Sequence, residues 1–287
     1  MLKKFALALL MLAMLAPVVN ADTAALTLDQ VLAKHYDAMG GLEKLKKIQT
    51  MRMSGKMQMG PGMEAPFTLE KKRPAMQRME FTFSGMTGIQ AYDGGKGWSV
   101  MPFMGKKDPE PMSDDDAKEM ADQADFDGAL VDWKAKGHTV ELVGKEAIEG
   151  ADTYKLKLTK KGGEVEYYYL DAETFLPIKL EGKRKIRGTE VEGESTLGDY
   201  KEVSGIMVPF SMTNGVKGSD RKQTMTFDKV EVDIPLENSR FMMPGGAAAP
   251  DSAKAAAKPG DKKDAGKKGA LKKDALKKAA SAETKGN

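Results

Sequence analysis

The chain has 287 residues, a formal net charge of +3 at pH 7 and no cysteine. Without cysteine it can form no disulfide and lacks the N-terminal cysteine of a bacterial lipoprotein, so we expect a free protein with an ordinary hydrophobic core. Its two histidines, His35 and His138, lie about a hundred residues apart. This spacing excludes an H-E-x-x-H zinc motif and leaves a serine triad without an obvious base.

Residues 1–21 are typical of a secretory signal peptide. Two lysines precede an apolar run that starts at Phe5, and the small residues Val19 and Ala21 follow it. The run is shorter than the roughly 20 residues that span a membrane, which favours a cleaved signal over the alternative, a membrane anchor. We therefore expect export to the periplasm and a soluble mature protein.

Residues 27–48 predict two helical elements. Apolar positions recur at helical spacing and form one stripe: Leu28, Val31, Leu32, His35 and Met39. Thr27 is the expected N-cap, and Gly40 with Gly41 ends the helix. A shorter helical turn follows at 42–48. Because His35 falls on the apolar stripe, we interpret it as a packed side chain rather than a ligand.

From residue 50 the apolar period changes to two. The stretch "TMRMSGKMQMGPGM" (50–63) alternates methionine with Arg52 and Lys56, as a half-buried strand does, and similar alternation recurs as far as residue 227. These segments amount to roughly ten short strands. They predict a mainly β (α+β) fold with an antiparallel sheet that is apolar on one side.

A helix interrupts this pattern after the proline-rich loop "MPFMGKKDPEPM" (101–112). Ser113 and Asp116 form a capping box, and the acidic residues at 114–116 lie at the positive end of the helix rather than in a calcium loop. Its apolar stripe consists of Ala117, Met120, Ala121 and Ala124. We expect this helix and the two at 27–48 to cover the apolar face of the sheet.

Residues 245–287 have a different composition, with 11 lysines against 5 acidic residues and no aromatic residue. Such a segment cannot bury enough apolar area to offset the entropy of ordering. We expect a disordered, solvated tail; a weak basic helix on an anionic surface is the alternative. Since no aromatic residue or arginine is interleaved with the lysines, we expect no binding to nucleic acid.

No motif indicates catalysis. The segment "GESTLG" lacks the G-x-S-x-G spacing, and "GGKG" at 94–97 lacks both the Ser or Thr and the upstream glycine of a phosphate-binding loop. Carboxylates are too abundant for any pair to be singled out for acid–base work. We therefore expect a binding protein, not an enzyme, with no cofactor and no metal.

Three stretches resemble the LolA-like family of periplasmic carriers and outer-membrane lipoprotein-sorting proteins. "KKRPAMQRMEF" (71–81) is similar to the family's K-R-P and the strand after it, "YDGGKGWSVMPF" (92–103) to its D-G-x-x-x-W-x-x-x-P-F hairpin, and "RFMMP" (240–244) to its closing F-x-x-P. They occur in the family's order and cover about 30 residues. The resemblance assigns residues 22–244 to a lipoprotein-sorting domain.

The resemblance implies a half-open antiparallel β-barrel of about eleven strands, with helices as a lid over an apolar cavity. It also implies a monomer that receives the acyl chains of lipoproteins, or another lipid, from an inner-membrane transporter and passes them to an outer-membrane acceptor. Arg73 matches the family arginine that hydrogen-bonds to the lid backbone and holds the empty cavity shut. The alternative for Arg73 is a solvated strand residue.

The one-sided apolar residues are the candidates for the cavity lining, although each could equally pack in the core. They are Met51, Met53, Met57, Met59, Phe67, Leu69, Met79, Phe81, Phe83, Trp98, Met101 and Met120. Methionine is unbranched and adapts to acyl chains of varied shape. Two other functions remain open: a methionine-rich copper-binding envelope protein, since thioethers select Cu(I), and an envelope-stress sensor of related fold. No histidine lies within the methionine run, which disfavours copper.

Overall fold

Thirteen antiparallel strands form one continuous sheet in the part of the chain that the structure describes. This part of the computed structural model comprises residues 25–60, 62–186, 189–220 and 222–245. The signal peptide predicted at 1–21 lies outside it, as do residues 246–287 of the predicted tail.

Two helices precede the first group of strands, and a third helix separates it from the second group. The helices are α1 (Leu28–Ala38), α2 (Leu42–Lys47) and α3 (Asp114–Ala124), with short 3-10 helices η1 (Pro102–Met104) and η2 (Asn238–Arg240). The first strands are β1 (Thr50–Gly60), β2 (Met63–Lys72), β3 (Met76–Phe83), β4 (Met86–Tyr92), β5 (Gly97–Met101) and β6 (Lys106–Pro111). The later strands are β7 (Thr139–Ile148), β8 (Ala151–Thr159), β9 (Val165–Asp171), β10 (Pro177–Ile186), β11 (Thr189–Val203), β12 (Ile206–Val216) and β13 (Lys222–Val232).

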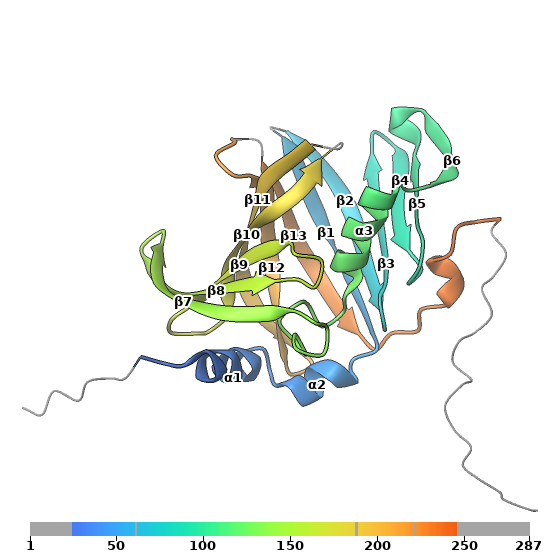
Figure 1. The fold of residues 1–287 in the computed structure, drawn as a ribbon. Helices are drawn as coiled ribbons and strands as arrows, with labels where there is room; N and C mark the ends of the chain where they lie inside the picture. The colour runs from blue at the N-terminus through green and yellow to red at the C-terminus, as the bar shows by residue number, and fades with distance from the viewer. Residues whose placement is uncertain (1–24, 61, 187–188, 221, 246–287) are drawn as a thin grey trace, which may run out of the picture. The chain divides into compact units, whose positions relative to one another are not determined.

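The first and the last strand lie side by side in the middle of the sheet (Figure 1), because β1 pairs with both β2 and β13. The other strands pair with their neighbours in sequence, and β6 and β7 form the two edges. Within the described residues these edges do not pair with each other, so the sheet stays open. The predicted mainly β fold, a half-open antiparallel barrel, is confirmed.

The predicted number of strands, about eleven, is lower than the thirteen observed. β6, with the sequence KKDPEP, was predicted as a loop, but it lies at a sheet edge, where proline removes no ladder hydrogen bond. β11 carries charged, polar or small residues at most positions. Neither strand has a continuous apolar face, so a search for apolar alternation does not detect it.

We call inner the face of the sheet on which Met53, Leu69 and Met79 lie opposite one another in β1, β2 and β3. Directly opposed residues of neighbouring antiparallel strands point to the same side. The inner face of the first strands therefore carries most of the methionines and phenylalanines that the sequence pattern singled out. The opposite face is called the outer face below.

A bulge lets β13 follow β1 without losing its inner apolar face. The register shifts by one residue, so that both Val230 and Phe227, which differ in parity, lie opposite inner positions of β1. Only glycine fits at Gly55 beside this bulge, because a Cβ there would lie 1.9 Å from the carbonyl oxygen of Thr226.

Thr27 and Ser113 are N-caps, as predicted, but the two reciprocal hydrogen bonds of a capping box are formed by Thr27 and Gln30, whereas the box was predicted at Ser113 and Asp116. Thr27 Oγ1 accepts a hydrogen bond from the N–H of Gln30 at 3.3 Å, Gln30 Oε1 accepts one from the N–H of Thr27 at 2.9 Å, and Ser113 caps α3.

His35 is 6% exposed, its Nδ1 lies 3.0 Å from the carbonyl oxygen of Phe175, and burial lowers its pKa. α1 belongs to a second apolar core with Val31, Leu32, Leu130, Val140, Leu156, Leu158 and Leu170. His35 is thus a packed side chain, as predicted.

The segment 233–245, which we call the C-terminal strap, crosses the outer face of the first strands. Four side chains of these strands donate hydrogen bonds to its backbone carbonyls: Thr50 to Ile234 at 2.7 Å, Lys72 to Leu236 at 2.6 Å, Arg78 to Arg240 at 2.9 Å and Trp98 to Phe241 at 2.7 Å. The donors belong to β1, β2, β3 and β5. The strap thereby covers one half of the sheet from outside.

Trp98 lies beneath the strap and not on the inner face, so its predicted place in the cavity lining is wrong. It pairs with Ala91, which pairs in turn with Arg78 of the outer face. Trp98 is 2% exposed and its partner Phe241 is fully buried. The predicted set combined Trp98 with Met101, three residues further along, although positions an odd number apart in a regular strand face opposite sides.

We predict that Trp98→Phe lowers the free energy of unfolding by about 1–3 kcal/mol, because it leaves the buried Phe241 carbonyl without its donor. Urea unfolding measures the change. Trp133→Phe is the matched control, since the Trp133 indole N–H donates no hydrogen bond within the described residues; it should cost less. Equal stability of the Trp98→Phe variant and the parent would contradict the anchoring role of this bond.

Candidate functional site: a lid over a methionine-rich inner face

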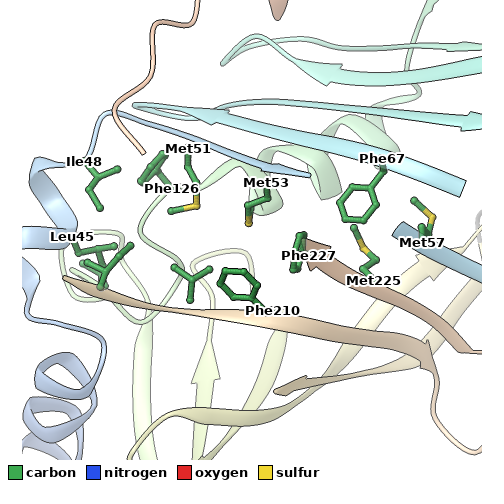
Figure 2. Close-up of a cluster of buried hydrophobic side chains, with 13 residues drawn as sticks. Leu45, Ile48, Met51, Met53, Met57, Phe67, Phe126, Phe210, Met225 and Phe227 are labelled. Carbon is green, nitrogen blue, oxygen red and sulfur yellow. The ribbon is translucent and has the colours of Figure 1, made fainter. Parts of the chain in front are cut away.

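Methionine and phenylalanine side chains from four strands meet on the inner face in one buried cluster (Figure 2). They come from β1 (Met51, Met53, Met57), β2 (Phe67), β12 (Phe210) and β13 (Met225, Phe227). The rings of Phe67 and Phe227 meet edge to face with centroids 5.4 Å apart. The cluster also contains Leu45 of α2, Ile48 directly after it, Phe126 and Val131 from the segment after α3, and Ile206 and Val208 of β12. The apolar face is therefore closed by elements that are not part of the sheet.

The predicted lining residues fall into three groups. Met51, Met53, Met57 and Phe67 belong to the cluster, and Leu69, Met79 and Phe81 pack against it. Phe83 and Met101 are partly exposed at the margin, where Phe83 contacts the ring of Phe103. Met120 belongs to α3, Trp98 lies on the outer face, and the side chain of Met59 is outside what the structure describes.

Sequence reasoning missed Phe210, Met225 and Phe227 as neighbours of the methionines, although all three lie in predicted strands. They follow the methionine run by about 150 residues. They reach it only because β13 pairs with β1, with Met57 opposite Met225 and Gly55 opposite Phe227. No local pattern in the sequence reports such a long-range pairing.

α3 lies over β3, β4 and β5 on the inner face (Figure 1), and its charged side chains also contact the other half of the sheet. On one side Met120, 7% exposed, receives a hydrogen bond on its sulfur from Gln77 Nε2 of β3 at 3.1 Å. On the other side two ion pairs join α3 to the β8–β9 hairpin: Lys118 with Glu164, and Asp122 with Lys160 at 2.9 Å. We call residues 113–131, which comprise α3 and the segment after it, the lid.

Arg73, at the end of β2, joins the sheet to both covering elements. Its Nε donates to the carbonyl oxygen of Ile48 at 2.6 Å, and Nη2 donates to that of Leu45 at 2.9 Å. Nη1 and Nη2 also donate to the carboxylate of Asp127 at 2.6 and 2.5 Å, and the guanidinium lies 4.5 Å from the ring centroid of Phe126. One side chain thus holds α2 and the lid together.

The Arg73–Asp127 pair remains charged at neutral pH. Burial raises the pKa of Asp127, but its hydrogen bonds and charge attraction to Arg73 outweigh this effect and hold the pKa below its usual value. Lys136 and Lys46 lower it further. Guanidinium suits this position because its planar set of five donors can serve a carboxylate and backbone carbonyls at once. The resemblance implied the backbone contacts; it gave no indication of Asp127.

Lys71, two residues before Arg73, is a lysine whose side chain lies on the inner face. It pairs with Met51 of β1 and with Gln77 of β3, two inner positions. Its Nζ donates to the carbonyl oxygen of Gln123, in the last turn of α3, at 2.7 Å. Burial lowers the pKa of Lys71 to about 8, although Asp125 acts in the opposite direction. The sequence analysis did not single out this residue.

The described residues contain neither a helix that could cross a membrane nor a cluster of His, Asp and Glu side chains that could hold a metal ion. No helix among them is long and apolar enough to cross a membrane. No group of three or more His, Asp or Glu side chains among them is placed to hold a metal ion. The buried methionines contact aromatic and aliphatic side chains, an environment that suits an apolar ligand.

No protein-family model matches the chain, and no curated protein matches it in sequence. Among solved structures, a DUF1329 family protein from Desulfovibrio piger is similar over 74% of this chain and 97% of its own, with a TM-score of 0.52 and 13% identity. A LolA superfamily protein from Nitrosomonas europaea is similar over 76% of this chain and 98% of its own, with a TM-score of 0.51 and 16% identity. The chain has a LolA-like fold, as its three motifs predicted.

We predict that Lys71→Met changes stability in a pH-dependent way. Because desolvation depresses the pKa of Lys71 in the folded state, the charged form of this half-buried side chain destabilises the parent below pH 8. The parent regains this free energy as pH rises towards the unfolded pKa of about 10.5. The stability advantage of Lys71→Met over the parent should therefore fall by roughly 2 kcal/mol between pH 7 and pH 10. Urea unfolding of both proteins at the two pH values measures this difference.

A control variant tests whether the pH-dependent change in stability is specific to Lys71 or follows from the removal of any lysine. Lys56 is exposed on the outer face of β1, so Lys56→Met should show no comparable change with pH. A stability difference between Lys71→Met and the parent that stays constant from pH 7 to pH 10 would contradict a depressed pKa for Lys71.

Proposed function

We propose that this LolA-like protein is a periplasmic carrier that binds the acyl chains of lipoproteins or similar lipids on its inner face and moves them toward the outer membrane. The observation that carries the proposal is Arg73, which holds α2 and the lid closed over a methionine-rich apolar cluster through polar contacts. The LolA-like fold and the predicted signal peptide support it. In this proposal the protein has no enzymatic activity.

The free energy needed to move an acyl chain out of a membrane requires a large apolar surface on the protein. A 16-carbon chain that leaves a membrane needs on the order of 10 kcal/mol of replacement contacts, at about 0.8 kcal/mol per buried CH₂. The cluster on the inner face offers such contacts once the lid moves away. Its methionines can repack around chains of different shape, because they are unbranched and have several rotatable bonds.

The closed state also has a physical role in this proposal. An open, empty apolar surface would be exposed to water and prone to association, so a carrier needs a cover that opens only for cargo. The contacts between the sheet and the lid include hydrogen bonds and ion pairs at Arg73, Lys118 and Asp122. Water can replace such partners on opening, so that their net contribution to closure stays modest.

The partners are inferred from the same reasoning. We propose that an inner-membrane lipoprotein-releasing transporter loads the protein and that an outer-membrane acceptor receives the cargo. Arg73 and the inner-face residues that pack in or against the cluster would form the working site. A copper-binding role for the methionines and a regulatory role as a stress sensor are the outcomes that the first experiment below must exclude.

We predict that the mature protein, purified from its native envelope, carries acylated proteins or lipids. Mass spectrometry of the bound material identifies the cargo, and elemental analysis of the same sample measures copper. The acyl-chain proposal rests on a buried surface of thioether, aromatic and aliphatic groups. Stoichiometric Cu(I) with no lipid would overturn it, and a bound envelope regulator without lipid would favour the sensor.

We predict that Arg73→Leu loads cargo but releases it poorly. Loss of the contacts to Ile48, Leu45 and Asp127 makes the closed state less favourable, and closure supplies part of the free energy that expels cargo. The measurement is transfer of a fluorescent acylated peptide from loaded protein to acceptor vesicles. Arg73→Lys should be intermediate, because lysine cannot serve all three partners. Unchanged loading and transfer in Arg73→Leu would count against the latch.

A further inference from the structure

We propose that Lys71 is a binding site for the anionic headgroup of the lipid cargo, either a carboxylate or a phosphate. The inference rests on the proposed lipid-binding function and narrows it to lipids with an anionic headgroup, because the ester- and amide-linked acyl groups of a lipoprotein carry no such charge. It starts from the position of Lys71 at the boundary between the apolar cluster and the lid.

The register fixes the direction of the Lys71 side chain. Lys71 lies directly opposite Met51 of β1, a cluster member that is 9% exposed, and opposite Gln77 of β3, whose side chain contacts the sulfur of Met120. The next inner residue of β2 is Leu69, which packs against the cluster. The Lys71 side chain therefore leaves the sheet beside Met51, on the face proposed to bind acyl chains.

The lid itself supplies the negative charge density that Lys71 faces in the closed protein. Nζ donates to the carbonyl oxygen of Gln123 in the last turn of α3, where the partial negative charge of the helix lies. Asp125, directly after the helix, also attracts Lys71, but its carboxylate pairs with Lys136 at 2.5 Å. Within the described residues Lys71 forms no ion pair of its own.

Opening of the lid removes both of these partners together, because Gln123 and Asp125 belong to the lid. Water solvates the Lys71 ammonium once the lid is open, but an acyl chain that covers the inner face displaces this water and leaves the charge without a partner, which is unfavourable. A carboxylate or phosphate on the cargo would restore a charge-assisted hydrogen bond, which is stronger than the bond to a neutral carbonyl. Lys71 would thus exchange the lid for the headgroup as cargo enters.

The acyl chain then has a direct path along the sheet. From Lys71, the inner positions of β2 are Leu69, Phe67 and Ala65, and they lie opposite Met53, Gly55 and Met57 of β1. Lys71 and Phe67 are separated by about 13 Å along the strand. A headgroup at Lys71 therefore places the chain over the methionine and phenylalanine cluster.

The test compares lipids that differ only in charge. The probes are palmitate with methyl palmitate, and palmitoyl lysophosphatidic acid with monopalmitoylglycerol; displacement of a neutral fluorescent lipid from the full mature chain gives each affinity. We expect the parent to bind each acid about tenfold or more tightly than its neutral counterpart. The pair with the larger ratio distinguishes a carboxylate from a phosphate headgroup.

Three variants assign this preference to Lys71. Lys71→Met should reduce both ratios to about one by weakening the acids far more than the neutral lipids, and Lys71→Arg should keep the preference. Lys56→Met removes an exposed lysine from the outer face and should bind like the parent. Equal affinities for acid and neutral lipid in the parent, or equal weakening of both by Lys71→Met, would overturn the headgroup site. Absence of binding to all four lipids would instead overturn the proposed function.

Discussion

The pairing of β1 with both β2 and β13 is the constraint on which the rest of the structure depends. It joins the first and last strands and places residues from opposite ends of the chain on one inner face. The bulge in β13 and the absence of a side chain at Gly55 make this pairing sterically feasible. The methionine cluster, the lid above it and the latch beside it all require this arrangement.

The two faces of the first strands are stabilised by different interactions, and the difference matches the proposed function. On the outer face the carboxylate of Glu70, 1% exposed, lies between Arg52 at 2.9 Å and Arg240 of the strap at 2.8 Å. Removal of either arginine would leave a buried charge without one partner, so this side is expected to stay fixed. The inner face is covered by the lid, which buries Phe126 and Val131 in the methionine cluster and is joined to the sheet by polar contacts such as the Arg73–Asp127 pair. In the proposed function the sheet stays fixed while the lid moves.

The three motifs that resemble the LolA-like family have distinct physical roles in the structure. The K-R-P motif provides Arg73, which contacts α2 and the lid. The tryptophan of the hairpin motif and the phenylalanine of the closing motif meet on the outer face, where the Trp98 indole donates to the Phe241 carbonyl. Two of the motifs thus stabilise the strap, and only the first lies at the proposed site.

The sequence by itself determined the mainly β fold, the helix caps, the packed state of His35 and the parity of the methionines in β1, because each depends on residues close together in the chain. Tertiary structure decided the rest. Trp98 took the outer face because strand register and the strap, not its apolar character, set its direction. Asp127 and Lys71 acquired their roles from contacts across 54 and 52 residues. Local periodicity reports which side of a strand is buried, but not which distant segment covers it.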